Sequence, residues 1–312
     1  MSYVVEIENL SKDYEVGFWK KKRVRALDDL NLRVTGGQIF GFLGGNGAGK
    51  TTTIKILMSL LFPTTGTARI LGSDISDVKM RSRIGYCPEN PYFYDYLKAR
   101  ELMNYFGELF GLDSRQRNRK TEELLTKVGL DEKDWNKQLR KFSKGMLQRV
   151  SLAQALINEP EIVFLDEPMS GLDPIGRREI RELIAELRTQ GTTVFMSTHI
   201  LSDIEALCDQ VAIMRKGKLA ATGKLDDLLS QNNQIQSFEI NLKGISIEAL
   251  NGSLAGIGGA TVSAKPNGAS VQVSSETDVE KLLAISKTLG GKLVSVQPLK
   301  QSLEELFVEK SE

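Results

Sequence analysis

The chain has 312 residues, of which 41% are hydrophobic and 26% are charged, and its formal net charge is +1. This balance is typical of a globular protein long enough for one large domain and one smaller domain, and it argues against a largely disordered chain. The near-neutral charge leaves no basic footprint for nucleic acid, and Cys87 and Cys208 lie too far apart in the sequence for a zinc or disulfide motif.

Short apolar runs alternate with helical segments over the first part of the chain. Four runs are nearly continuous in apolar residues, at 39–43, 162–165, 192–197 and 211–214. Such runs are typical of strands buried on both faces of a parallel sheet. At about 90–158 the strand signals stop and helical periodicity replaces them. The pattern predicts an α/β core with an inserted helical subdomain.

Beyond the polar stretch SQNNQIQS, which starts at Ser230, the pattern begins again. Strand-like segments FEINL, ATVSAK, ASVQVSS and KLVSVQPL surround a helical VEKLLAISKTL, and SLEELFVEK follows them. The glycine-rich GSLAGIGGA has no following lysine and helix in register, so we expect a turn-rich connection there. We therefore predict a large domain at 1–230 and a small α+β domain at 235–312.

The strongest chemical motif is GGNGAGKTTTIKIL, which matches GxxxxGK[ST] between a predicted strand and a helical run. In that context backbone N–H groups wrap a phosphate at the start of the helix. Lys50 is expected to reach the β- and γ-phosphates, and Thr51 to ligate magnesium. The predicted ATP-binding residues of this phosphate loop are Gly44, Asn46, Gly47, Ala48, Gly49, Lys50, Thr51 and Thr52.

Two acids end the next predicted strand, in the segment IVFLDEP. Because ligands of an open parallel sheet bind outside the carboxyl ends of its strands, both acids are placed for catalysis. We assign Asp166 to the metal and Glu167 to the general base that activates water. The run TTVFMS ends at the same edge, so His199, the one histidine of the chain, is expected beside Glu167 if the two strands are neighbours. It would donate to the γ-phosphate or orient the water.

Two further helix starts carry polar groups. Ser143, Lys144 and Gly145 offer a hydroxyl and backbone N–H groups to a second anion. Asp173 is predicted to cap a helix whose first residue is Pro174.

In their order along about residues 3–230, these motifs resemble the nucleotide-binding subunit of an ATP-binding cassette (ABC) transporter. The resemblance identifies GGNGAGKTT as Walker A, FSKGM as the signature, IVFLDEP as Walker B, SGLDP as the D-loop and STHIL as the switch histidine. It implies that Tyr14 stacks on adenine, although a tyrosine there is equally an ordinary surface residue. It also implies that the signature contacts ATP held by another subunit. The signature residues are Ser143, Lys144, Gly145 and Met146, and the D-loop residues are Ser170, Gly171, Leu172 and Asp173.

The chain departs from the common family pattern in three places. Gly45 replaces a frequent proline, and Lys144 and Met146 depart from the LSGGQ form. Glu89 stands where glutamine is usual, as a possible third metal ligand and a coupling residue, or as a solvated loop acid. The PEN and SKGM variants, with a small C-terminal domain ending in SLEELFV, resemble ABC-2 type exporters, which include multidrug, gliding-motility and sodium-extrusion ATPases.

The resemblance therefore implies an ATPase that uses ATP and Mg²⁺ and drives an exporter through ATP-driven dimer closure. Its implied partners are a separate transmembrane permease and either a second copy of the chain or a different ATPase subunit. Because the most apolar run, IKILMSLLF, is too short to span a membrane, we expect a cytoplasmic protein, peripheral at the inner face of the membrane. The alternative is a soluble ABC protein acting as a nucleotide-switched binding module in translation or DNA repair. The second cassette or long coiled-coil insertion of those proteins is not apparent in the sequence.

Overall fold

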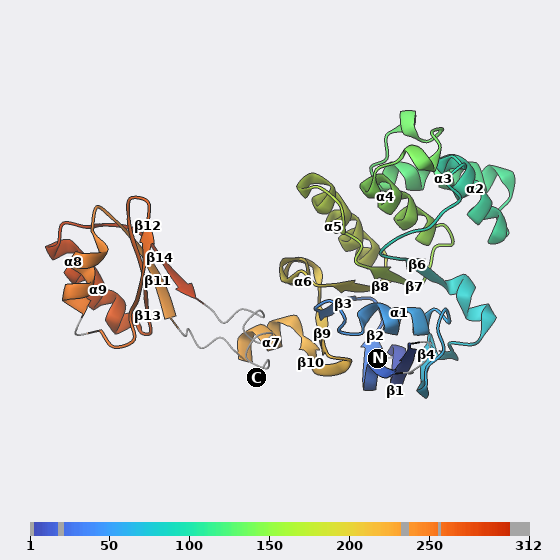
Figure 1. Cartoon of the computed structure of the whole chain (residues 1–312). Coiled ribbons are helices and arrows are strands. Elements are labelled where there is room, and N and C mark those ends of the chain that lie inside the picture. Colours follow the sequence, from blue (N-terminus) through green and yellow to red (C-terminus); the bar gives the residue numbers. More distant parts are fainter. Residues whose placement is uncertain (1–2, 18–21, 232–236, 255–256, 300–312) are drawn as a thin grey trace. The chain divides into compact units, whose positions relative to one another are not determined.

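Figure 1 shows the computed structural model, which describes residues 3–17, 22–231, 237–254 and 257–299. The chain divides into two compact units, residues 1–225 and 226–312. The domain division expected at 230–235 lies partly outside the described residues, and the segment SLEELFV lies wholly outside them.

A six-stranded sheet forms the centre of the first unit, in the strand order β10-β9-β3-β8-β7-β6. Its strands are β3 (Ile39–Gly44), β6 (Ile84–Cys87), β7 (Ile162–Asp166), β8 (Thr193–Thr198), β9 (Gln210–Arg215) and β10 (Lys218–Lys224). All pairings are parallel except that of β9 with β10. The four strands predicted from apolar runs are confirmed, and every residue of β3, β7 and β8 is buried.

Aromatic side chains fill the core beside this sheet. The ring of Phe195 in β8 lies 5.3 Å, centroid to centroid, from the rings of Phe40, Phe42 and Phe164. These rings come from β3 and β7, and all four side chains are fully buried. Ring pairs at this spacing stabilise a core beyond the area they bury. The cluster therefore fixes the relative positions of three strands whose carboxyl ends lie side by side.

Helices follow most strands of this six-stranded sheet along the chain. They are α1 (Lys50–Leu57) after β3, α5 (Pro174–Thr189) after β7, α6 (Leu201–Leu207) after β8 and α7 (Leu225–Gln231) after β10. The Oδ1 atom of Asp173 accepts from the backbone N–H of Gly176 at 3.0 Å, and Pro174 is the first residue of α5. The predicted cap is therefore confirmed.

The inserted subdomain contains α2 (Ala99–Leu109), α3 (Ser114–Lys127) and α4 (Lys144–Ala155), with 3₁₀ turns at Glu132–Asp134 and Leu139–Lys141. The chain forms no strand between residues 92 and 157, all of which are described, as predicted. Buried leucines such as Leu102 in α2 and Leu125 in α3 give each helix the apolar stripe by which it packs.

A second sheet in this unit was missed by the sequence analysis. Its order is β2-β1-β4-β5, with β1 (Tyr3–Val16), β2 (Lys22–Thr35), β4 (Thr65–Ile70) and β5 (Ser73–Asp74), and a 3₁₀ turn follows at Val78–Arg83. All its pairings are antiparallel. Buried and exposed residues alternate in β2 rather than forming a continuous apolar run. Register shifts around Leu10 interrupt the same alternation in β1.

Beyond α7, the described part of the second unit is a four-stranded antiparallel sheet with two helices, in the strand order β12-β13-β11-β14. Its elements are β11 (Ser237–Lys243), α8 (Ile247–Ser253), β12 (Thr261–Lys265), β13 (Gly268–Val273), α9 (Glu276–Thr288) and β14 (Lys292–Leu299). Ile240, Leu250, Val271 and Leu282 are buried in its own core. The predicted strands and the helix near 279–289 are present, whereas α8 was not predicted and includes the start of GSLAGIGGA.

No helix of the described residues in either unit is long and apolar enough to cross a membrane.

Candidate active site

The phosphate loop, residues 44–52, connects β3 to α1. Gly47 and Gly49 have φ angles of +77° and +105°, in the region that glycine adopts without strain. A Cβ atom at Gly49 would lie 2.8 Å from the carbonyl oxygen of Ala26, so no larger residue fits there. Because α1 begins at Lys50, the first backbone N–H groups of this helix have no helical acceptor and are available to an anion.

The loop borders a cavity of about 500 Å³. The cavity is lined by Val24, Arg25, Ala26, Gly45, Asn46, Gly47, Ala48, Gly49, Lys50, Thr51, Thr52, Glu89, Glu167 and His199. The structure therefore brings together the predicted loop residues, both predicted catalytic residues and Glu89. Gly44 does not line the cavity, but its carbonyl oxygen accepts from Lys50 Nζ at 2.6 Å.

Lys50 is only 6% exposed, so its ammonium group must be paired. Besides the bond to Gly44, its Nζ lies 3.3 Å from Oε1 of Glu167. The ammonium group is thus held between the carbonyl oxygen of Gly44 and Glu167, the predicted general base. An incoming phosphate could replace the contact with Glu167.

Asp166 ends β7 and lies opposite Ser197 of the neighbouring β8. Its Oδ1 accepts from Ser197 Oγ at 2.5 Å and from Thr51 Oγ1 at 3.3 Å. Burial raises the pKa of this carboxyl above its ordinary value, the two hydroxyl donors lower it, and the charge of Glu89 raises it further. Because burial disfavours the ionised form of this carboxylate, a cation bound beside it would stabilise that form.

No group of three or more His, Cys, Asp and Glu side chains within the described ranges is arranged to hold a metal ion by itself. The predicted set of Thr51, Asp166 and Glu89 supplies one hydroxyl and two carboxylates beside the loop. Oxygen donors of this kind are those that Mg²⁺ prefers, with phosphate oxygens completing the set. The residues fit a magnesium ion that binds together with a nucleotide.

Glu167 follows Asp166 in a left-handed conformation, with φ at +51°. Its backbone N–H donates to Ser197 Oγ at 3.1 Å, so a single hydroxyl fixes both adjacent acids. Its Oε2 lies 2.9 Å from Nδ1 of His199, and the predicted proximity of these two side chains is confirmed. If Nδ1 donates to Glu167, Nε2 of a neutral imidazole is an acceptor, and only the imidazolium donates from both nitrogens.

Other predicted residues lie outside the cavity lining. Tyr14 does not line it, but pairs across the sheet with Val24, which does. Side chains of such a pair project from the same face of a sheet.

The signature and the D-loop contact each other rather than lining the cavity. Ser143 Oγ accepts from the backbone N–H of Met146 at 3.2 Å and so caps α4. Lys144 Nζ donates to Ser170 Oγ at 3.2 Å, and a Cβ atom at Gly145 would lie 3.2 Å from a methyl group of Leu172.

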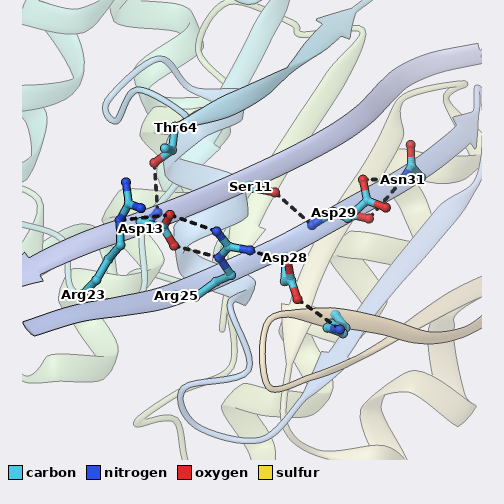
Figure 2. Close-up of polar contacts among 9 residues, drawn as sticks. Ser11, Asp13, Arg23, Arg25, Asp28, Asp29, Asn31 and Thr64 are labelled. Atoms are coloured by element: carbon cyan, nitrogen blue, oxygen red, sulfur yellow. Dashed lines mark hydrogen bonds and ion pairs between the residues drawn. The ribbon is translucent and has the colours of Figure 1, made fainter.

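Four contributors to the site escaped the sequence analysis, namely Ser197 and three cavity-lining residues of β2, Val24, Arg25 and Ala26. Ser197 is one of several polar residues after an apolar run, and only the register of β8 against β7 selects it. Arg25 lies in a basic stretch that the motifs do not cover, and its carboxylate partners are shown in Figure 2.

Several known proteins are similar to this chain. Residues 27–170 match a family model described as "ABC transporter". The chain is 43% identical to an uncharacterized ABC transporter ATP-binding protein of Synechocystis sp., over 98% of this chain and 84% of that protein. It is 37% identical to the bacitracin transport ATP-binding protein BcrA of Enterococcus faecalis, over 81% of this chain and 80% of that protein.

A solved structure is similar to this chain as well. The dimeric, post-hydrolysis form of the ATP-binding cassette MJ0796, bound to ADP and Pi, has a TM-score of 0.66 and 26% identity. The match covers 71% of this chain and 98% of that chain.

Proposed function

The chain belongs to the ABC transporter ATP-binding proteins, which are ATPases, and we propose that it hydrolyses ATP in the cavity beside its phosphate loop to drive a membrane exporter. One observation carries the assignment of this site. The Glu167 carboxylate is held between Lys50 Nζ at 3.3 Å and His199 Nδ1 at 2.9 Å, at the end of β7 and beside the loop.

Each residue has a definite part in binding. The first backbone N–H groups of α1 and its loop bind the phosphates, and Lys50 exchanges its contact with Glu167 for the β- and γ-phosphates. Thr51 and Asp166 would hold Mg²⁺, with Glu89 next to them. The ion would neutralise charge that develops on the phosphate oxygens.

Hydrolysis needs a base for the attacking water. Glu167 accepts a proton from the attacking water while the water oxygen bonds to the γ-phosphorus. The bond between the γ-phosphorus and the β,γ-bridging oxygen breaks, which gives ADP and phosphate. His199, whose Nδ1 lies beside the Oε2 atom of Glu167, orients the γ-phosphate or the water. Positioning and electrostatics supply most of the rate in such reactions.

The signature is proposed to complete the site of another subunit. Ser143 and Gly145 sit at the start of α4, where backbone N–H groups favour an anion, yet they do not line the cavity of their own chain. The dimeric form of MJ0796 supports a composite arrangement. The partner is a second copy of this chain or a different ATPase subunit, and nucleotide binding closes the pair.

A permease is proposed to dock beside the helical subdomain, which places the chain at the inner face of the membrane. A groove of about 350 Å³ is lined by apolar residues that include Leu60, Tyr92, Phe93 and Phe110. Tyr92 is 97% exposed in this groove. Exposed apolar patches of this kind mark protein interaction sites. Glu89 lines the nucleotide cavity, and its sequence neighbours Pro88 and Pro91 line this groove, so it is our candidate for coupling. The similarity to BcrA, which is named as a bacitracin transport protein, supports the exporter assignment.

ATP hydrolysis by the purified full chain tests the proposal. Lys50→Ala should remove measurable release of phosphate, because the buried cation that holds the phosphates is lost. Lys55→Ala is the matched control, since Lys55 is exposed on the same helix. Equal hydrolysis by both variants would place the site elsewhere.

A further inference from the structure

A tight turn joins the predicted general base to the D-loop. The backbone N–H of Ser170, the first D-loop residue, donates to the carbonyl oxygen of Glu167 at 3.0 Å. The N–H of Glu167 is itself bonded to Ser197, so the backbone of the base is held from both sides. A displacement of Ser170 would therefore be transmitted directly to Glu167.

The side chain of Lys144 lies over this turn. Its Nζ donates to Ser170 Oγ at 3.2 Å. The carbon atoms of its stem lie 2.8–3.2 Å from the position that a Cβ atom of Gly171 would take. Gly171 has a φ angle of +75°, which glycine adopts without strain, and its missing side chain leaves the room that the lysine stem occupies. Lys144 thus contacts the D-loop of its own chain through both its stem and its ammonium group.

Two more contacts join α4 to the same segment and to α5. A Cβ atom at Gly145 would lie 3.2 Å from a methyl group of Leu172. One turn further along α4, Arg149 Nη2 lies 2.7 Å from Glu179 Oε2 of α5, and the arginine side chain is only 13% exposed. The signature and the D-loop are therefore held together within a single chain.

Two functions are open to a lysine at this position. As a cation in the first turn of α4, Lys144 could contact a phosphate that another subunit holds. Its ammonium group instead donates to a hydroxyl of its own chain, and that hydroxyl belongs to the residue bonded to Glu167. The LSGGQ form has glycine in place of Lys144, and a glycine could not make this contact. The geometry therefore favours a function at the site of its own chain.

We propose that Lys144 is a positioning residue for the general base of its own chain. Through Ser170 it holds the turn that follows Glu167, and so fixes the base for proton transfer. The inference rests on the proposed function, because it assigns Lys144 a part in hydrolysis at that site. Lys144 does not line the nucleotide cavity, so it would affect the rate of hydrolysis and leave ATP binding unchanged.

A double-mutant cycle measured on ATP hydrolysis by the full chain tests this. Lys144→Met keeps the stem over Gly171 and removes the donor, whereas Ser170→Ala removes the acceptor. Each should lower kcat about fivefold, the upper scale for a solvent-accessible charged contact, because the base is less well fixed. The double variant should be no slower than either single variant, because both changes remove one shared contact.

The KM for ATP and equilibrium ATP binding should stay at the parent values in all three variants, which also shows that each variant is folded. Lys141→Met is the matched control, since Lys141 is an exposed lysine in the 3₁₀ turn just before the signature. It should keep the parent kcat.

Losses of kcat that multiply in the double variant would show two independent functions and overturn the inference. If ATP binding by Lys144→Met also weakens, Lys144 is a phosphate contact instead. Parent kcat in Lys144→Met would overturn the inference alone. A parent chain that hydrolyses no ATP would overturn the proposed function, and the inference with it.

Discussion

The role of His199 can be tested one ring nitrogen at a time. Nδ1 lies 2.9 Å from Glu167 Oε2, and about half of the side chain is exposed, which leaves Nε2 for a ligand. An asparagine amide places its nitrogen near the position of Nδ1, and a glutamine amide reaches the position of Nε2. His199→Asn therefore keeps a donor for Glu167, whereas His199→Gln keeps a donor for the phosphate. If orientation of the γ-phosphate is the function, the glutamine variant should be the more active.

The expected loss follows from one hydrogen bond. A hydrogen bond to a charged group contributes about 1.5–3 kcal/mol. Because such a bond from His199 orients the reacting groups and does not anchor the nucleotide, its loss should appear in kcat. His199→Ala and His199→Asn should each slow hydrolysis roughly ten- to hundredfold, and His199→Gln should lie closer to the parent.

Single-turnover hydrolysis and equilibrium ATP binding, measured on the same preparations, separate rate from affinity. All three variants should bind ATP nearly as tightly as the parent. A faster asparagine than glutamine variant would move the function to the contact between Nδ1 and Glu167. A large loss of affinity with normal turnover at saturation would make His199 a binding residue and refute the reasoning.

Three further predictions concern the same site. Gly47→Ala should lower the free energy of unfolding by about 1–2 kcal/mol, because its backbone is left-handed. Gly49→Ala should lower it further, because the added Cβ atom would also clash with the carbonyl oxygen of Ala26. Urea unfolding measures both losses, and equal losses would contradict this. Since burial raises the pKa of Asp166, its contribution to stability is lost as pH rises through the folded-state pKa. Asp166→Asn should therefore stabilise the ligand-free chain near neutral pH, with no gain in acid, and thermal unfolding at both pH values checks the sign. In vesicles with the cognate permease, Glu89→Ala should lower transport per ATP hydrolysed while Glu89→Gln retains it, and unchanged transport in Glu89→Ala would make Glu89 a solvated loop acid.

Many of the site residues that follow the carboxyl ends of the parallel strands could be predicted, because such strands obey a simple rule. Continuous apolar runs mark strands covered on both faces, and the residues after them meet at one edge of the sheet. That rule alone predicted Glu167 beside His199. It did not identify Ser197, because the register of β8 against β7 decides which polar residue at the strand end lies opposite Asp166. A shift of one residue would turn each side chain to the other face of the sheet.

The antiparallel sheet escaped prediction for a different reason. Its strands are covered on one face only, so their apolar residues alternate with polar ones, and the shifts around Leu10 interrupt the alternation. The contact between Arg25 and Asp13 depends on that missed sheet, since the two residues face each other across β1 and β2. No local motif marks such a pair, because the two residues are brought together only by the register of β1 against β2.

The central claim is that Glu167 activates the attacking water, and hydrolysis by Glu167→Gln with parallel ATP-binding and gel-filtration measurements tests it most directly. Loss of a general base should slow turnover by roughly 10² or more while ATP affinity stays nearly intact. The variant should then accumulate as an ATP-bound dimer, which elutes earlier with ATP than without it. A variant that hydrolyses ATP at the parent rate would contradict the account and remove Glu167 from this role.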